Sequence, residues 1–165
     1  MLKTIFKQTI GIIMRMAIII LIFSLSLQNV SAQQRRYAII TMVKGNVEVR
    51  LAENEWQKAE KGMILYPNDE IRTGKKDYAQ LWLDKNASTG RLEVKGGTRM
   101  RLNILDFNAK TNDKTTLLGV AIGRVMIHAQ KLHGNSRFEV QTPTSIMGVR
   151  GTSFEVIVEE KEKKK

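Results

Sequence analysis

Apolar and polar residues alternate one by one along much of the chain after residue 37, as they do in β-strands that have one face in a protein core. The alternation is clearest in residues 45–51, 78–83, 99–104 and 123–129. The apolar residues that we expect on the buried face are Val47, Val49, Leu51, Ala79, Leu81, Leu83, Met100, Leu102, Ile104, Val125, Ile127 and Ala129. The pattern therefore predicts one strand in each of these ranges.

Short clusters of turn-forming residues separate the alternating runs, among them YPND, TGKKD, DKNASTG and HGNS. Strands that recur about every 8–12 residues with turns between them predict an all-β domain. We place this domain in residues 37–158 and expect either a compact antiparallel β-sandwich or a β-solenoid-like coil of strands. Trp56 fits a strand better than a helix, because Gly62 interrupts the helical alternative. A turn at Gly62 and a strand over residues 63–65 should follow.

Residues 1–32 have the layout of a secretory signal peptide. Three basic residues precede an uncharged apolar run over residues 16–27, and the small residues Ser31 and Ala32 follow it. This run is shorter than the roughly 20 residues of a membrane-spanning helix, so we predict cleavage after Ala32 and an exported, periplasmic protein. The alternative is an uncleaved signal anchor over residues 10–27, which would hold the protein in the inner membrane with its domain in the periplasm.

The chain carries a formal net charge of +11 and has no cysteine. A basic chain suits nucleic acid, an acidic membrane face or an anionic polymer. An exported protein does not meet nucleic acid, so the expected partner is an envelope protein or an anionic envelope polymer, with the inner membrane added only if the signal segment is retained. Without cysteine, we expect no disulfide and no thiol chemistry. Residues 159–165, EEKEKKK, are too charged to be buried and should form a solvated tail.

The polar residues do not have the spacing of a catalytic, cofactor or metal site, so we expect none of these. His128 and His133 are the only histidines, and no carboxylate or cysteine accompanies them at metal-ligand spacing. Residues 106–113 are rich in oxygen ligands but lack the glycine and the final glutamate of a calcium loop. Ser145 and Ser153 have no histidine near them in the sequence; a triad assembled from distant residues is the enzyme alternative that this leaves open.

Several arginines occupy outward positions of the predicted strands: Arg50, Arg72, Arg91, Arg99, Arg101 and Arg124. Two interpretations fit them. They form either a solvated face that keeps the protein soluble or a patch that binds an anionic polymer of the cell envelope. The order of the strands decides whether these arginines gather on one surface.

Four stretches of the sequence follow one another in an order that is typical of a known domain. They are GNVEVRLAENEWQKAEKGMILYPNDEIRTGKKDYAQLWLD, TRMRL, LLGVAIGRVMI and FEVQTPTSIMGVRGTSFEV. This succession resembles the FecR domain, a periplasmic module first known from ferric-citrate regulators. The motif residues, to which the resemblance assigns structural roles, are Trp56, Gly62, Asp69, Thr73, Gly74, Thr142, Pro143, Gly148, Arg150, Gly151, Thr152 and Phe154.

The resemblance implies a function as well as a fold. It favours a non-enzymatic, exported FecR-domain protein that acts as a periplasmic binding or interaction module of the cell envelope. The alternative is a membrane-anchored signalling component related to the FecR-type anti-sigma regulators. Two features depart from the family pattern. Asn68 replaces the usual glycine, which a left-handed turn tolerates. Many relatives continue beyond the position of Val158, so we expect a sheet edge there that is exposed or covered by a partner.

The closing stretch TPTSIMGVRGTSFEV carries the most specific motif. Pro143 should end a strand, because proline has no backbone N–H to donate. Gly148 and Gly151 should adopt positive φ angles and make a corner, after which Phe154 re-enters the core. Arg150 at this corner should donate hydrogen bonds to carbonyl groups of neighbouring turns. We therefore predict that Arg150 stabilises the fold rather than binding a ligand.

Overall fold

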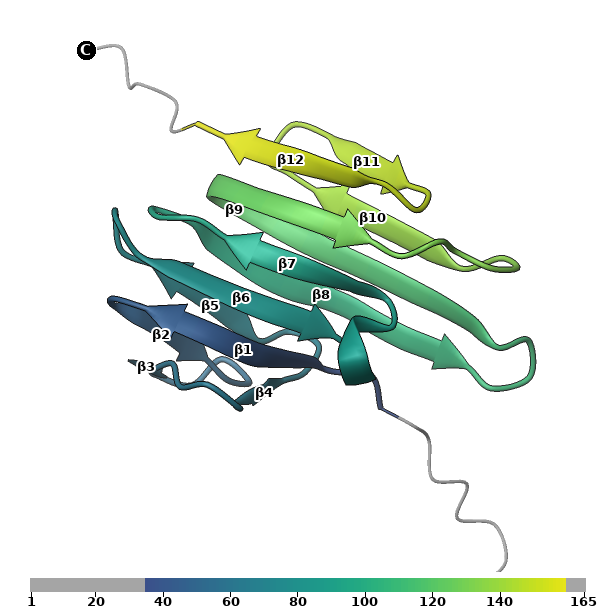
Figure 1. The fold of residues 1–165 in the computed structure, drawn as a ribbon, viewed down its shortest axis with the longest axis horizontal. Coiled ribbons are helices and arrows are strands. Elements are labelled where there is room, and N and C mark those ends of the chain that lie inside the picture. Colours follow the sequence, from purple (N-terminus) through teal and green to yellow (C-terminus); the bar gives the residue numbers. More distant parts are fainter. Residues whose placement is uncertain (1–34, 160–165) are drawn as a thin grey trace, which may run out of the picture. The chain divides into compact units, whose positions relative to one another are not determined.

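The computed structural model describes residues 35–159, which form a domain built from β-strands (Figure 1). The predicted signal peptide, the alternative anchor and all but the first residue of the predicted tail lie outside the described residues. Within residues 35–159, no helix has the length and apolar character needed to cross a membrane.

The strands follow one another closely along the chain. They are β1 (Ala38–Lys44), β2 (Val47–Arg50), β3 (Trp56–Lys58), β4 (Ile64–Leu65), β5 (Glu70–Thr73), β6 (Tyr78–Leu83), β7 (Gly90–Val94), β8 (Arg99–Asn108), β9 (Asp113–Ala129), β10 (Arg137–Gln141), β11 (Ile146–Val149) and β12 (Ser153–Val158). A short 3-10 helix, η1 (Lys85–Ala87), lies between β6 and β7. The all-β prediction is confirmed.

All strands belong to one strongly curled sheet, whose two halves face each other as the layers of a sandwich (Figure 1). The first layer has the order β3-β2-β5-β8-β9-β10-β11. The second layer has the order β12-β9-β7-β6-β1-β4. Every described strand pair is antiparallel except β9–β10. The predicted compact antiparallel β-fold is confirmed, in the form of one strongly curled sheet.

Strand β9 belongs to both layers and joins them. Its first half pairs with β8 and β10, and its second half pairs with β7 and β12. Between the halves, Gly123 has a φ of 100°, and a Cβ atom at this position would overlap the backbone of Thr98. The Thr98 side chain holds the bend, because its Oγ1 accepts a hydrogen bond from Arg124 N at 2.9 Å and donates one to Arg124 O at 3.1 Å. Only glycine fits this bend without strain.

The inward residues of the two layers form one apolar core, largely as the alternation predicts. Val47, Val49, Leu81 and Ile127 are fully buried. Ile104 is wrongly predicted as a core residue. It is 40% exposed, because the pairing of β8 with β9 shifts register after Leu102. The shift turns Leu105 inward in its place, as a β-bulge does. Leu51, directly after β2, and Ala129, at the end of β9, are only partly buried.

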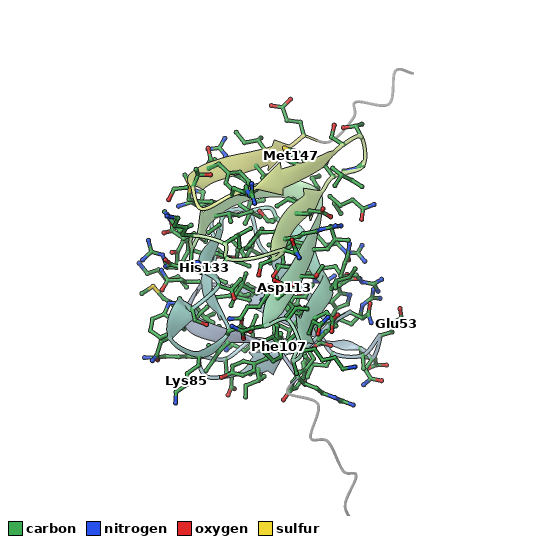
Figure 2. All side chains as sticks on the ribbon, turned by 90° about the vertical axis from the view of Figure 1, so that its right-hand side faces the viewer. Glu53, Lys85, Phe107, Asp113, His133 and Met147 are labelled. Carbon is green, nitrogen blue, oxygen red and sulfur yellow. The ribbon has the colours of Figure 1, made fainter. Side chains whose placement is uncertain are left out.

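The sandwich has a closed end and an open end. At the closed end, residues 59–63 pass from β3 in one layer to β4 in the other. Ala59 N donates to Val47 O at 2.8 Å, and Gly62 N donates to Ile40 O at 2.7 Å, so this segment is bonded to both layers. At the open end lie β11 and β12, which pair only with β10 and β9 among the described strands. Met147 of β11 marks this end at the top of Figure 2.

Candidate functional site

A buried carboxylate surrounded by arginines lies on the outer side of the first layer. Glu70 of β5 is 5% exposed. Arg50 Nη2 donates to its Oε1 at 2.7 Å, and Arg99 Nε donates to its Oε2 at 2.9 Å. Arg101 Nε lies 3.0 Å from Oε1, close enough for an ion pair but without hydrogen-bond geometry. Burial by itself raises the pKa of Glu70, but the hydrogen bonds from Arg99 and Arg50 outweigh it and hold the pKa below its ordinary value.

The same arginines gather around an indole ring. The guanidinium carbon of Arg72 lies 4.2 Å from the centroid of the Trp56 ring, that of Arg50 at 5.4 Å and that of Arg99 at 5.7 Å. These distances are within the range of cation–π attraction, which is about 6 Å. Trp56 of β3 therefore holds three guanidinium groups, from β2, β5 and β8, close to one another.

The strand register explains why the cations accumulate. Glu48 lies opposite Arg72 and Arg50 lies opposite Glu70, which are favourable pairs of opposite charge. In the next pair of strands, however, Arg72 lies directly opposite Arg99, which are like charges. Such a pair is unfavourable by itself, and two carboxylates offset it here, since Arg72 Nε donates to Glu48 Oε2 at 2.7 Å and Arg99 Nε to Glu70 Oε2 at 2.9 Å.

We call this surface the arginine face and define it by Arg50, Arg72, Arg99, Arg101, Glu48, Glu70 and Trp56. Glu53, from the turn after β2, adds a third carboxylate at 3.1 Å from Arg101 Nη2, but its side chain is 71% exposed. Four guanidinium groups thus meet three carboxylates. The side chains of Arg99 and Arg72 are 49% and 43% exposed, so both are accessible from solvent.

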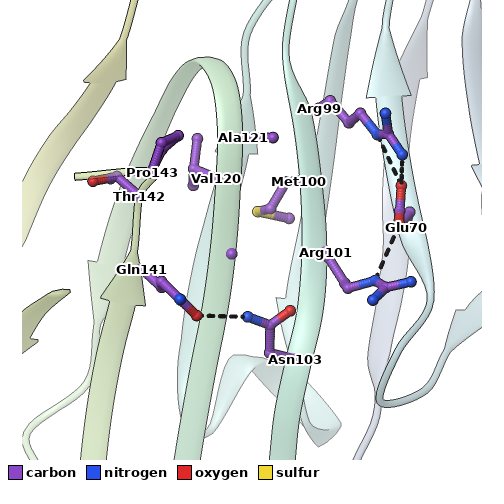
Figure 3. Close-up of a pocket in the computed structure, with 11 residues that line it drawn as sticks. Glu70, Arg99, Met100, Arg101, Asn103, Val120, Ala121, Gln141, Thr142 and Pro143 are labelled. Carbon is purple, nitrogen blue, oxygen red and sulfur yellow. Dashed lines mark hydrogen bonds and ion pairs between the residues drawn. The ribbon is translucent and has the colours of Figure 1, made fainter. Parts of the chain in front are cut away.

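A shallow groove of about 450 Å³ runs from the arginine face across β8 and β9 (Figure 3). Arg99 and Arg101 form one side. At Gly119 of β9, an added Cβ would come within 2.9 Å of Asn103 Nδ2. The absence of a side chain at Gly119 therefore leaves space in the groove. Asn103 Nδ2 donates to Gln141 Oε1 at 3.2 Å across the groove. The lining residues are Glu70, Arg99, Met100, Arg101, Asn103, Gly119, Val120, Ala121, Gln141, Thr142 and Pro143.

This arrangement offers hydrogen-bond donors to an anion and amides to neighbouring hydroxyl groups. Guanidinium groups recognise carboxylates and phosphates through paired N–H donors. Residues 35–159 contain no cluster of three or more His, Asp or Glu side chains that could hold a metal ion. The guanidinium groups of the arginine face can therefore bind an anion.

The structure brings together four of the six arginines that the alternation places outward. The other two, Arg91 and Arg124, lie on the second layer, where Arg91 is 3.7 Å from Glu93 and Arg124 is 3.8 Å from Glu155. The sequence analysis missed Glu70 as the centre of the cluster. The alternation does place Glu70 and Arg72 on the same face of one strand. The cluster could not be predicted from this alone, because it forms only when β5 pairs with β2 and β8.

A second polar row crosses the outer side of the second layer. His128 Nδ1 lies 2.9 Å from Ser153 Oγ, and His128 Nε2 lies 3.2 Å from Glu93 Oε1. The hydrogen bond from Lys95, then that from His128, lowers the pKa of Glu93, although burial opposes them. The row has the composition of a hydrolase triad, which the sequence hides because its members come from β12, β9 and β7. Its acidic member also binds two cations, since Glu93 lies 3.1 Å from Lys95 Nζ and 3.7 Å from Arg91 Nη2, so the row is part of a wider ion-pair network on this layer.

The role predicted for Arg150 belongs to another arginine. Arg36 is 5% exposed, and its Nη1 donates to the carbonyl oxygens of Asp106 at 3.1 Å and Thr115 at 2.8 Å. Its Nε bonds the carboxylate of Asp84 at 3.0 Å. Burial lowers the pKa of Arg36, and Asp84 opposes the shift. Arg150, by contrast, is exposed and makes no side-chain hydrogen bond within residues 35–159.

Most motif residues lie in turns or at strand ends. Asp69 accepts hydrogen bonds from Ala52 N at 2.8 Å and Tyr66 N at 2.7 Å, and Thr73 Oγ1 donates to Lys95 O at 2.6 Å. Trp56 belongs to the arginine face. The remaining motif residues in turns or next to strands are Gly62, Gly74, Thr142, Pro143, Gly151 and Thr152.

The closing motif differs from its prediction at one glycine. Gly151 has a φ of 64°, and its added Cβ would lie 2.9 Å from Lys131 Cα, so it makes the expected corner. Gly148 lies within β11, does not have a positive φ and has open space where a Cβ would point. The corner therefore needs one glycine and not two. Phe154 packs against the core from β12, as expected.

Comparisons with known proteins bear on the family alone. No curated protein and no solved structure matches the chain. The family model described as FecR protein matches residues 69–165, which include β5 to β12 and the complete closing motif. The chain belongs to the FecR family.

Proposed function

We propose that this FecR-domain protein is an exported, non-enzymatic binding module of the cell envelope, and that its arginine face holds an anionic polymer. One observation carries the proposal. Arg72 and Arg99 lie directly opposite each other in the sheet, and both converge on Trp56. Arg72 Nε donates to Glu48 Oε2 at 2.7 Å and Arg99 Nε donates to Glu70 Oε2 at 2.9 Å, so each guanidinium group is ion-paired on one side. A carboxylate or phosphate group that bridges the two arginines would use the N–H donors that these bonds leave free.

The groove supports an extended ligand rather than a single ion. It begins beside Arg99 and Arg101 and continues over Gly119 towards Gln141 (Figure 3). A polymer that places an anionic group on the arginine face can therefore lay its next unit against Asn103 and Gln141. Amide side chains of this kind donate to and accept from hydroxyl groups.

The test is binding of the full chain to defined polyanions, with alginate as the carboxylate polymer and polyphosphate as the phosphate polymer. We compare wild type with a double variant that carries Arg72→Gln and Arg99→Gln. Loss of two charge-assisted hydrogen bonds should weaken binding by about tenfold or more at low salt. The preferred polymer identifies the anionic group.

The matched control removes the same charge from the other layer, through Arg91→Gln and Arg124→Gln. If binding depends only on net charge, both double variants lose the same affinity, and the arginine face is not the site. If neither polymer binds to wild type at low salt, the ligand is not an anionic polymer, and a protein partner becomes the better hypothesis.

Export is part of the proposal and rests on the N-terminal segment. Edman sequencing of the protein recovered from the cell envelope should start at Gln33. A protein that retains Met1 would instead support the membrane-anchored signalling component. Ala32→Arg should block cleavage and leave the longer form, because signal peptidase needs a small residue there.

A further inference from the structure

The open end of the sandwich presents two unpaired strand edges. Strand β11 pairs with β10 on one side, and β12 pairs with β9 on one side; within residues 35–159, nothing pairs with their other sides. The two strands lie at the same end of the domain (Figure 1). They contain neither proline nor lysine, which proteins commonly use to protect such edges.

Both edges carry apolar side chains towards solvent. Ile146 is 65% exposed, Ile157 is 51% exposed and Met147 is 36% exposed. On the inner side, Val149 and Phe154 pack against the core but remain partly exposed. Among residues 35–159, nothing covers the core at the open end.

The edge of β12 is complementary to itself. When two identical strands pair antiparallel about a twofold axis at Val156, Phe154 lies opposite Val158 of the second copy. Residues that are opposite in such a pair point to the same face, so the apolar inner face of one copy continues into that of the other. On the outer face, Glu155 lies opposite Ile157 of the second copy.

We propose that two copies of this chain associate through their open ends, with β12 of one copy pairing antiparallel with β12 of the other about Val156. The same axis, perpendicular to the layers, also brings the two β11 strands towards each other. A single extended segment of another protein would cover one of the two edges and leave the other exposed. A second copy covers both, and the contact is isologous and closed.

The first test uses the absence of native cysteine. In Val156→Cys, the two introduced residues are self-opposed, with Cα atoms about 4.5–5.5 Å apart, which suits a disulfide. Full chain recovered from the cell envelope under oxidising conditions should run as a covalent dimer on a non-reducing gel. Ile104→Cys, exposed on β8 away from both edges, is the control and should stay monomeric. A monomer in both variants, or a dimer in the control alone, contradicts the proposal.

The second test uses the outer face and leaves the core intact. Ile157→Glu places a glutamate opposite Glu155 of the second copy at two symmetric positions, and should weaken the dimer by roughly tenfold. Ile157→Lys places opposite charges there and should retain it. Light scattering of the full chain in mild detergent, over a dilution series, measures both. A wild-type monomer at every concentration, or equal dissociation of the two variants, would overturn this pairing.

Discussion

At the closed end, the edge strands β3 and β4 are three and two residues long and are joined by a segment bonded to both layers. At the open end, β11 and β12 are four and six residues long and carry exposed apolar side chains. Short edges that are covered by a connecting segment resist pairing with other chains, whereas longer uncovered edges invite it. The two ends of one sandwich are thus suited to different tasks, stability at one and association at the other.

The polar contacts show the same difference. Asp69, in the turn that leads from β4 to β5, is buried and accepts two backbone hydrogen bonds. At the open end, Thr142 Oγ1 accepts a hydrogen bond from Ser145 N in an exposed turn. When a buried contact is broken, its N–H donors have no acceptor and water does not replace it. Substitutions at the closed end should therefore lower the free energy of unfolding more than those at the open end.

The largest effect is expected for Asp69→Ala. It leaves Ala52 N and Tyr66 N without their acceptor and should lower the free energy of unfolding by about 3 kcal/mol or more. Thr142→Ala, the control at the open end, should cost less than about 1 kcal/mol, because water replaces the lost partner. Urea denaturation of both variants measures the difference. Equal losses would show that the two ends do not differ in stability.

The turn at the open end should still be sensitive at one position. Gly151→Val forces a β-branched residue into a positive φ and should cost about 1–3 kcal/mol. Gly148→Val meets open space in a strand and should change stability by less than about 0.5 kcal/mol. Thermal melts of the pair check this. A large loss in Gly148→Val would mean that the strand β11 needs its glycine after all.

Acidification should destabilise the domain through Glu70 of the arginine face. Because the native pKa of Glu70 lies below its ordinary value, its contribution to stability is complete above that ordinary value and is lost as the pH falls through the native pKa. Glu70→Gln should therefore be less stable than wild type at neutral pH and lose less stability on acidification. Melts of wild type and Glu70→Gln, recorded from neutral to acid pH, measure the difference.

The smallest effect is expected for Arg150→Ala. Its exposed side chain makes no hydrogen bond within residues 35–159, so the free energy of unfolding should change by no more than about 0.5 kcal/mol. Thermal melts measure this change. Arg36→Ala, which leaves buried carbonyl groups and Asp84 unpaired, should cost several times more. If Arg150→Ala proves as costly as Arg36→Ala, the sequence-based prediction for Arg150 holds.

The sequence predicted the strands and their faces well, because alternation is a local property. Val47 and Leu81 are buried where the pattern places them. It failed where the outcome depends on pairing between distant strands. The bulge that exposes Ile104 comes from the register of β8 against β9. The site shows the same limit, since Glu70 meets Arg50 and Arg99 from positions 20 and 29 residues away.

Strand β9 also determines when the domain can fold during synthesis. It is the neighbour of β8 and β10 in one layer and of β7 and β12 in the other, so the earlier sub-sheets β3-β2-β5-β8 and β4-β1-β6-β7 are not joined before it is made. The edges of β7 and β8 that pair with β9 must stay unpaired until residues 113–129 have emerged. Contacts that span such long stretches of sequence form slowly, and unpaired edges are prone to aggregate meanwhile. A ribosome-bound chain that stops before β9 should therefore be protease-sensitive, and one that extends past β12 should be resistant.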